Sequence, residues 1–165
     1  MNEDNYVEWL VKQKAPAYGI LLKVVMAVLS VGSIVFAMGS IIGMILMFAL
    51  WAATYFVFIR LNVEYEYLFA EGGLSVDAIY GKARRKKVFD CEKDEIQIVA
   101  PADSHSLKDY ESQGMVEKDF SSRQKSAAVY ALISQKGGVN TKILIEPNER
   151  MLNAMRRSFP RKIQL

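Results

Sequence analysis

The sequence predicts a helical hairpin embedded in a membrane, followed by a mainly-β domain of antiparallel strands and a C-terminal helix, an α+β arrangement. Three observations lead to this fold class. The run Val24–Ile59 contains no charged residue. After Arg60, apolar residues recur at every second position, which is typical of half-buried strands. Near the end of the chain, Met151, Met155 and Phe159 recur at four-residue steps, as they would on one face of a helix.

The charge-free run decides the class of protein. A charged side chain at the centre of a bilayer costs about 2.5–3.5 kcal/mol on insertion scales, so lipid selects long runs without charge. The run is far longer than the roughly 20 residues that one spanning helix needs. Two antiparallel helices at about 18–38 and 41–59 explain its length, if Lys23 extends to the interface. We therefore predict a transmembrane hairpin within residues 16–60.

The turn of this hairpin has two interpretations. Gly39 and Gly43 have the spacing of a small-residue motif that brings transmembrane helices together. They also lie where the chain must reverse, and glycine adopts backbone angles that other residues avoid. We favour the turn.

The basic residues predict the orientation of the hairpin. Lys12, Lys14, Lys23 and Arg60 lie at its outer ends, whereas its turn carries no charge. The positive-inside rule then places both termini in the cytoplasm. The first residues are acidic and the apolar run is too long for a cleaved signal peptide, so we expect a multi-pass anchor in the cell membrane.

Residues 1–15 combine aromatic residues with alternating charges. Tyr6, Trp9 and Leu10 would share one face of a short helix lying in the membrane interface. A partly ordered tail with two apolar anchors is the alternative. Either way, we treat residues 1–15 as an interfacial segment distinct from the domain that follows the hairpin.

The domain over residues 63–165 is predicted to contain six or seven antiparallel strands. Glycine pairs mark two hairpin turns, at Glu71-Gly72-Gly73 and Lys136-Gly137-Gly138. Asn148 can cap the final helix, which would close the open end of the sheet. The polar segment Ala102–Lys125 reads as a flexible or functional loop. The strands are expected at Val63–Phe69, Leu74–Tyr80, Arg84–Phe89, Glu95–Val99, Ala127–Ser134 and Thr141–Glu146, with a weaker candidate at Met115–Phe120.

Several of these segments resemble a known family. The residues Val63-Glu64-Tyr65-Glu66-Tyr67, the glycine hairpin after them, and the basic segment before Ile96-Gln97 are similar to bacterial pleckstrin-homology-like (PH-like) membrane proteins. Val7–Lys12 and Ile145–Glu149 resemble a narrower group of uncharacterised Firmicute two-helix membrane proteins. The resemblance implies a PH-like antiparallel sheet or barrel of six to seven strands capped by a C-terminal helix. It implies no known reaction and no agreed ligand. Many members pair two hairpins or two domains, whereas this chain has one of each.

One cluster of cations is a candidate lipid-headgroup site. Each cation near an anionic membrane surface contributes about 1 kcal/mol of attraction. Acidic residues follow the cluster directly, and alternation along a strand divides its charge between two faces. A solvated basic edge that discourages strand aggregation is the alternative. The cluster consists of Lys82, Arg84, Arg85, Lys86 and Lys87.

A second basic group surrounds the final helix. Cations near a helix C-terminus suit the helix dipole, so this group has a structural explanation, with lipid contact as the lesser alternative. It consists of Arg150, Arg156, Arg157, Arg161 and Lys162.

Catalytic, metal and cofactor signals are poor. The only histidine, His105, lies in a polar loop beside Asp103 and Ser104, and neighbours in one loop cannot align a nucleophile, a base and an orienting acid. The only cysteine, Cys91, cannot form an internal disulfide and is expected to be buried and inert. One histidine with Asp103 or Asp109 nearby provides too few ligands for a metal site. The sequence has no phosphate-loop or dinucleotide pattern, so we expect no metal and no cofactor.

The distribution of charge argues against two further function classes, nucleic-acid binding and transport. The net charge of +3 is too small to indicate nucleic acid without a clustered basic-aromatic surface. The predicted spans contain no ionisable residue in their interior, which argues against transport. We expect a non-enzymatic adaptor or scaffold that holds a protein partner at the membrane. The alternative is a reader of anionic lipid headgroups through residues 82–87, and a small membrane enzyme would have only His105 as a base.

Overall fold

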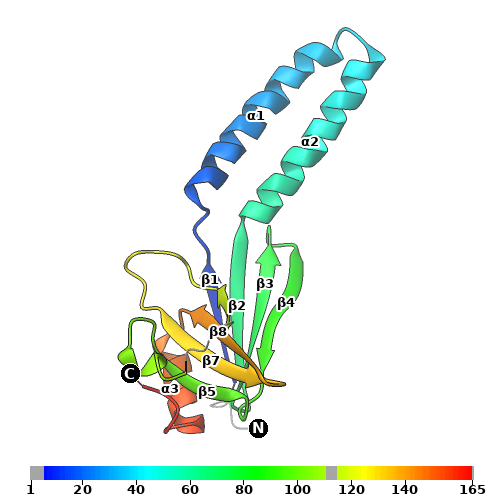
Figure 1. Cartoon of the computed structure of the whole chain (residues 1–165). Coiled ribbons are helices and arrows are strands. Elements are labelled where there is room, and N and C mark those ends of the chain that lie inside the picture. Colours follow the sequence, from blue (N-terminus) through cyan, green and yellow to red (C-terminus); the bar gives the residue numbers. More distant parts are fainter. Residues whose placement is uncertain (1–5, 111–114, 165) are drawn as a thin grey trace. The chain divides into compact units, whose positions relative to one another are not determined.

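The computed structural model describes residues 6–110 and 115–164, and it divides them into two compact units (Figure 1). The hairpin unit consists of Ala15–Val63 together with the short turn segment Tyr80–Arg84. The sheet unit consists of the N-terminal residues as far as Lys14, Glu64–Ile79, and the chain from Arg85 onward.

The hairpin unit contains the two predicted apolar helices, α1 (Ala17–Ala37) and α2 (Ile41–Leu61). Each has 21 residues and is long and apolar enough to cross a membrane. Their bounds confirm the predicted pair of helices. Side chains along both helices are largely exposed, as expected of segments that would face lipid.

Glycine is required in the first turn of α2, where this helix passes the end of α1. The Ser40 hydroxyl caps α2 by accepting a hydrogen bond from the Gly43 N–H, at 3.0 Å. A Cβ atom at Gly43 would lie 2.1 Å from the carbonyl oxygen of Phe36. The two helices therefore approach each other too closely for any side chain at position 43. The chain reverses between Ala37 and Ile41 as predicted, but neither Gly39 nor Gly43 has a positive φ, so Gly43 serves close helix packing rather than an unusual backbone angle.

A small polar cluster joins the two helices near their middle. The hydroxyl oxygens of Ser30 and Thr54 are 2.8 Å apart, and the Trp51 indole N–H donates to the Ser30 carbonyl oxygen at 3.1 Å. Interhelical hydrogen bonds in an apolar medium contribute about 0.6–2 kcal/mol each. These bonds therefore fix the alignment of α1 against α2.

The first sheet shows that the N-terminal helix prediction is wrong. Its order is β1-β2-β3-β4, and β1 (Tyr6–Lys12) pairs antiparallel with β2 (Val63–Ala70). Val7 and Val11, which are almost fully buried, lie four residues apart, a spacing that fits both a helix face and an alternating strand. The unpaired edge of β2 selects the strand. Residues 1–5 of the predicted interfacial segment lie outside the described residues.

The other two strands of this sheet follow the prediction. They are β3 (Gly73–Tyr80) and β4 (Arg84–Cys91). The side chains Leu74, Val76 and Ala78 of β3 are buried at alternate positions, as the period of two predicts. The strand β4 lies at the edge of the sheet, with β3 as its neighbour.

The second sheet has the order β5-β7-β8-β6. Its strands are β5 (Ile96–Pro101), β7 (Tyr130–Lys136), β8 (Val139–Ile145) and β6 (Val116–Asp119). The pairs β5–β7 and β7–β8 are antiparallel, but β6 pairs parallel with β8, so the expectation of a wholly antiparallel sheet is wrong at this edge. With β1 included, the described residues form eight strands rather than six or seven.

The C-terminal helix α3 (Glu149–Ser158) completes the core. The Asn148 side chain caps it by accepting from the Met151 N–H at 2.8 Å, as predicted. Met151 and Met155 are fully buried and Phe159 nearly so, in one apolar cluster with residues of both sheets. After the helix, the Gln164 N–H donates to the Val99 carbonyl oxygen at 2.8 Å, so the chain end covers the outer edge of β5.

The segment 102–125 is more ordered than a continuous loop. The strand β6 confirms the weaker strand candidate within it, whereas the short helix η2 (His105–Leu107) and the burial of Phe120–Ser122 were not predicted. The Tyr67 hydroxyl donates to the Phe120 carbonyl oxygen at 2.6 Å, and the Ser122 N–H donates to the Glu146 carboxylate at 3.1 Å. Residues 111–114 of this predicted loop lie outside the described residues.

Asp119 organises the tight bend that follows β6. One carboxylate oxygen accepts from the backbone N–H and the hydroxyl of Ser121, at 3.0 and 2.7 Å, and the other accepts from Arg123 Nε at 2.8 Å. Burial alone would raise the pKa of Asp119, but the hydrogen bonds from Ser121 and the charge of Arg123 outweigh it and hold the pKa below its usual value.

We predict that Gly43→Ala destabilises the hairpin by roughly 1–3 kcal/mol, because its methyl group overlaps the Phe36 carbonyl. Gly32→Ala is the matched control, since a Cβ at position 32 meets nothing within 4 Å and alanine favours a helix by about 1 kcal/mol. Titration of the full chain with sodium dodecyl sulfate, followed by circular dichroism, measures both. Equal behaviour of the two variants would contradict the close packing at the turn.

We predict that Asp119→Asn lowers the free energy of unfolding at neutral pH by roughly 1–2 kcal/mol, because charged hydrogen bonds and an ion pair are lost. Because the pKa of Asp119 is lower in the folded chain than in the unfolded chain, its carboxylate stabilises the fold. This contribution is complete above the unfolded-state pKa of about 3.9 and is lost as the pH falls through the folded-state pKa. The variant and the native chain should therefore converge in strong acid. Denaturation across a pH series, with the exposed Asp109→Asn as control, tests this; a pH-independent difference would contradict it.

Candidate functional site

The predicted basic cluster lies on the turn between β3 and β4 and on the first half of β4. The turn is tight, because the Ala83 N–H donates to the Tyr80 carbonyl oxygen at 3.1 Å. Both central residues have positive φ, 55° at Gly81 and 61° at Lys82. Turns of this kind favour glycine and asparagine, and a lysine held in the left-handed region costs roughly 1–2 kcal/mol. The chain therefore holds a strained lysine at this position.

The turn is attached to the ends of the apolar helices through Asn62. The Gly81 N–H donates to the Asn62 carbonyl oxygen at 2.9 Å, and the Lys23 ammonium donates to the Asn62 side-chain oxygen at 2.8 Å. A Cβ at Gly81 would lie only 3.0 Å from Ile59 Cγ1, so the turn packs directly on the last turn of α2. We call this arrangement of α1, α2 and the turn the Asn62 junction. All of it belongs to the hairpin unit.

Ion pairs divide the five predicted cations into two groups. Arg85 lies 2.7 Å from Glu66 of β2 and 3.9 Å from Asp77 of β3, and Lys87 lies 3.3 Å from Asp90. Exposed pairs of this kind contribute little stability, but they neutralise much of the local charge. The other three cations are exposed and form no ion pair with any described residue. They are Lys82, Arg84 and Lys86.

Sequence reasoning missed the acidic partners of Arg85. It expected neutralisation by the acidic residues after the strand, and Asp90 does act in this way on Lys87. Glu66 and Asp77, however, come from neighbouring strands. Their alternation with buried residues placed them on the outer face of the sheet, but the sequence does not reveal which residues of β2, β3 and β4 lie side by side.

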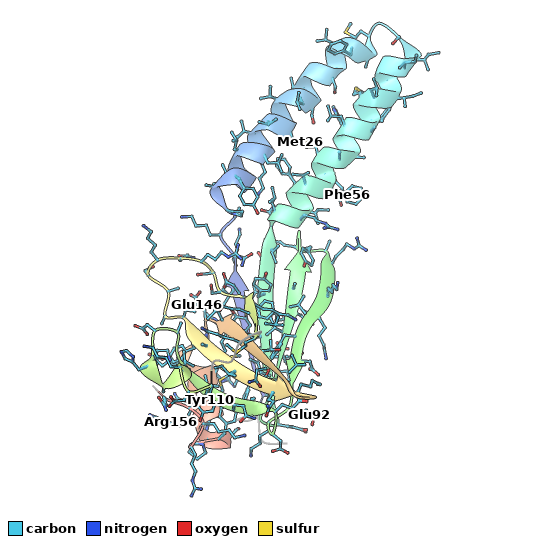
Figure 2. The ribbon with its side chains drawn as sticks, viewed as in Figure 1. Met26, Phe56, Glu92, Tyr110, Glu146 and Arg156 are labelled. Atoms are coloured by element: carbon cyan, nitrogen blue, oxygen red, sulfur yellow. The ribbon has the colours of Figure 1, made fainter. Side chains whose placement is uncertain are left out.

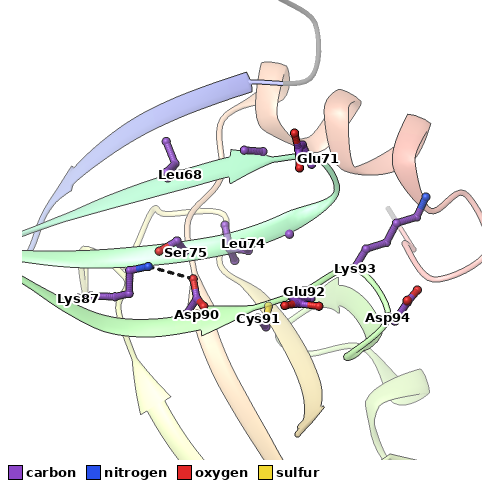
Figure 3. A pocket seen from close by; sticks show the side chains of 12 residues that line it. Leu68, Glu71, Leu74, Ser75, Lys87, Asp90, Cys91, Glu92, Lys93 and Asp94 are labelled. Carbon is purple, nitrogen blue, oxygen red and sulfur yellow. Dashed lines mark hydrogen bonds and ion pairs between the residues drawn. The ribbon is translucent and has the colours of Figure 1, made fainter.

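A groove of about 440 Å³ lies beside the second half of β4 (Figure 3). Leu68 and Ala70 of β2 contribute apolar surface, and the Lys87–Asp90 pair lies at its side. Further carboxylates come from Glu71 and from the turn after β4. The groove thus offers mixed polar and apolar contacts next to the exposed basic residues of the strand.

Cys91 also lines this groove, but its thiol is almost fully buried. Burial raises the pKa of the Cys91 thiol to about 12, so the thiol stays protonated at neutral pH. Because the thiolate is the nucleophile, Cys91 is a poor one. This agrees with the structural role expected for it.

The other candidate residues do not assemble into a reactive site. His105 is exposed on η2, and the Ser104 hydroxyl lies 2.7 Å from that of Ser106 rather than on the imidazole. Within residues 6–110 and 115–164, no three histidine, cysteine or acidic side chains are grouped to hold a metal ion. In the second basic group, Arg156 and Arg157 occupy the last turn of α3, where the helix dipole favours cations. Figure 2 labels Arg156.

Comparison with known proteins assigns a family to nearly the whole chain. Residues 3–165 match the family model described as "Bacterial PH-like domain (DUF6106)", a family of unknown function. No curated protein and no solved structure matches the chain. The match includes the two apolar helices as well as both sheets, and it confirms the resemblance that the strand motifs indicated.

We predict that Gly81→Ala weakens the Asn62 junction more than Gly137→Ala weakens its own turn. Both glycines have φ near 55°, so both variants lose about 1 kcal/mol to backbone strain. Only the methyl group at position 81 meets Ile59, which adds roughly 1 kcal/mol. Hydrogen exchange on the full chain should show faster exchange at residues 80–84 in Gly81→Ala alone. Equal exchange in both variants would contradict the packing of this turn on α2.

Proposed function

Since the chain belongs to the bacterial PH-like domain family, we propose that it is a non-enzymatic, membrane-anchored adaptor that holds a protein partner at the cytoplasmic surface. PH-like domains are typically binding modules rather than catalysts. The two apolar helices supply the anchor, and the sheet unit supplies the binding surface.

The pairing of β1 with β2 supports the proposed orientation. The helical hairpin is inserted between these two strands, which are paired from Tyr6–Ala70 to Lys12–Glu64. The segments before and after the hairpin must then lie on the same side of any membrane that the helices cross. The flanking Lys12, Lys14, Lys23 and Arg60 select the cytoplasmic side by the positive-inside rule.

The observation that carries the adaptor proposal is the exposed edge of β4. The strand has β3 as its neighbour in the sheet, and the four residues Arg84–Lys87 are all exposed. An edge strand presents unpaired backbone N–H and C=O groups, to which an extended segment of another protein can add. The groove at the other end of β4 would receive side chains of the same segment.

The charge of this edge indicates which segment binds there. Two copies of β4 lying edge to edge would bring like charges together, which disfavours self-association. An extended segment rich in Asp and Glu is complementary to Lys86 and, more weakly because of its pair with Asp90, to Lys87. Charge complementarity gives both specificity and fast association. We therefore propose an acidic, extended segment of a different protein as the occupant.

The alternative function is a reader of anionic headgroups through the whole segment 82–87. The ion pairs of Arg85 and Lys87 weaken this alternative, because they reduce the charge available to lipid along the strand. Lys82 and Arg84 differ from the rest of the cluster. They belong to the hairpin unit, and neither forms an ion pair with a described residue.

We predict that a photo-crosslinking residue in place of Lys86 captures a protein partner in intact cells. The same residue in place of Lys125, which is exposed but lies outside β4, should not capture this partner. Adding Lys87→Glu should reduce capture at position 86 roughly tenfold, because an acidic segment would then meet a carboxylate. Capture that is equal at both positions, or indifferent to Lys87→Glu, would contradict the β4-edge proposal.

A further inference from the structure

We propose that the Asn62 junction binds the phosphate of an anionic lipid headgroup. The site is a basic collar made of Lys23, Arg60, Lys82 and Arg84. This inference goes beyond the adaptor function and does not depend on it, because it concerns how the chain meets the bilayer rather than what the sheet unit captures.

The four cations belong to one compact unit. Lys23 and Arg60 lie on the two apolar helices, and Lys82 and Arg84 lie on the turn segment that groups with those helices. Asn62 holds the parts together, since its side chain accepts from Lys23 and its backbone carbonyl accepts from Gly81, the residue before Lys82. The collar therefore does not depend on how the sheet unit is oriented.

The collar coincides with the end of the apolar surface. The charge-free run ends at Ile59, and Arg60 is the basic residue in the last turn of α2. The turn packs against Ile59 itself. If α2 crosses the hydrocarbon core, Lys82 then lies at the depth where lipid phosphates are found, as do Lys23 and Arg60.

The collar has no acidic partner in residues 6–110 and 115–164. Among the described residues, none of its four cations forms an ion pair, in contrast to Arg85 and Lys87. Lys23 is held by the neutral Asn62 side chain and lies 5.7 Å above the centre of the Phe58 ring. An ammonium has three donors, so Lys23 keeps capacity for a phosphate oxygen. The charge of the collar is left for an external anion.

Lys82 is one of three described non-glycine residues with positive φ, beside Glu71 and Arg123. This lysine has φ of 61°, in the left-handed region where glycine or asparagine is the favoured residue. Strained backbone is found preferentially at functional positions. At this position lysine provides a positive charge, which glycine and asparagine would not. Lys82 lies in a turn that is packed on the helix end, so a cation is held there in place of a more relaxed residue.

The test measures retention of lipid by the purified full chain. The protein is extracted in a neutral detergent and incubated with phosphatidylglycerol or phosphatidylcholine, and bound lipid is counted by native mass spectrometry. The collar variant is Lys82→Asn with Arg84→Gln, in which asparagine keeps the left-handed turn while removing the charge. The charge-preserving variant is Lys82→Arg with Arg84→Lys. The matched control, Lys86→Gln with Lys87→Gln, removes two cations just beyond the collar on β4.

We expect the native chain to retain phosphatidylglycerol in preference to phosphatidylcholine. The collar variant should lose affinity for phosphatidylglycerol about 30-fold, with unchanged circular dichroism, because each cation near the surface contributes about a fivefold effect. The charge-preserving variant and the β4 control should stay within about twofold of the native chain, a range well below the effect of one cation.

Three results would overturn the proposal. Unchanged retention in the collar variant would show that these cations do not bind lipid. Equal losses of phosphatidylglycerol affinity in the collar variant and the β4 control would show a general attraction to the positive charge of the chain rather than a binding site. Displacement of phosphatidylglycerol by millimolar inorganic phosphate would identify the ligand as free phosphate and not a lipid headgroup. None of these results depends on the capture of a protein partner, so the adaptor proposal is tested separately.

Discussion

The pairing of β1 with β2 is the constraint on which the rest of the structure depends. Lys12 lies opposite Glu64, so the chain leaves and re-enters the first sheet at the same place. Everything between these residues, including 42 residues in two 21-residue helices, is an insertion between neighbouring strands. A single crossing of a membrane is incompatible with this pairing, whereas a hairpin of two helices satisfies it. The Asn62 junction follows directly, because one residue separates the end of α2 from the start of β2.

The sequence was informative wherever a local pattern has one physical cause. Lipid excludes charge, so the two helices could be predicted from composition alone, and the glycine pairs with alternating flanks located β2, β3, β7 and β8. The strand β1 was missed because the spacing of Val7 and Val11 fits two periods, and only its distant partner β2 decides between them. The same holds for Phe120, which has polar neighbours in the sequence but is buried, with its carbonyl oxygen accepting from the Tyr67 hydroxyl.

The candidate site illustrates the same limit. The five cations of residues 82–87 are evident in the sequence, but their division into paired and unpaired groups is not. It depends on which strands bring Glu66 and Asp77 beside Arg85, and on the attachment of Gly81 to Asn62. Lys82 and Arg84 thereby join Lys23 and Arg60, which are far away in sequence, while Lys86 and Lys87 remain on the exposed edge of β4. In our two proposals, one basic segment contributes to two surfaces, one that meets lipid and one that meets an acidic protein segment.

The pairing of β1 with β2 can be tested most directly by placing nitroxide labels at positions 12 and 64 of the full chain in bilayers, with Cys91→Ser to leave no other thiol. Opposed residues of an antiparallel pair have Cβ atoms about 5 Å apart, so the doubly labelled chain should show strong dipolar broadening in its continuous-wave spectrum. A spectrum equal to the sum of the two singly labelled chains would contradict the pairing, and with it the account of the hairpin as an insertion in the sheet.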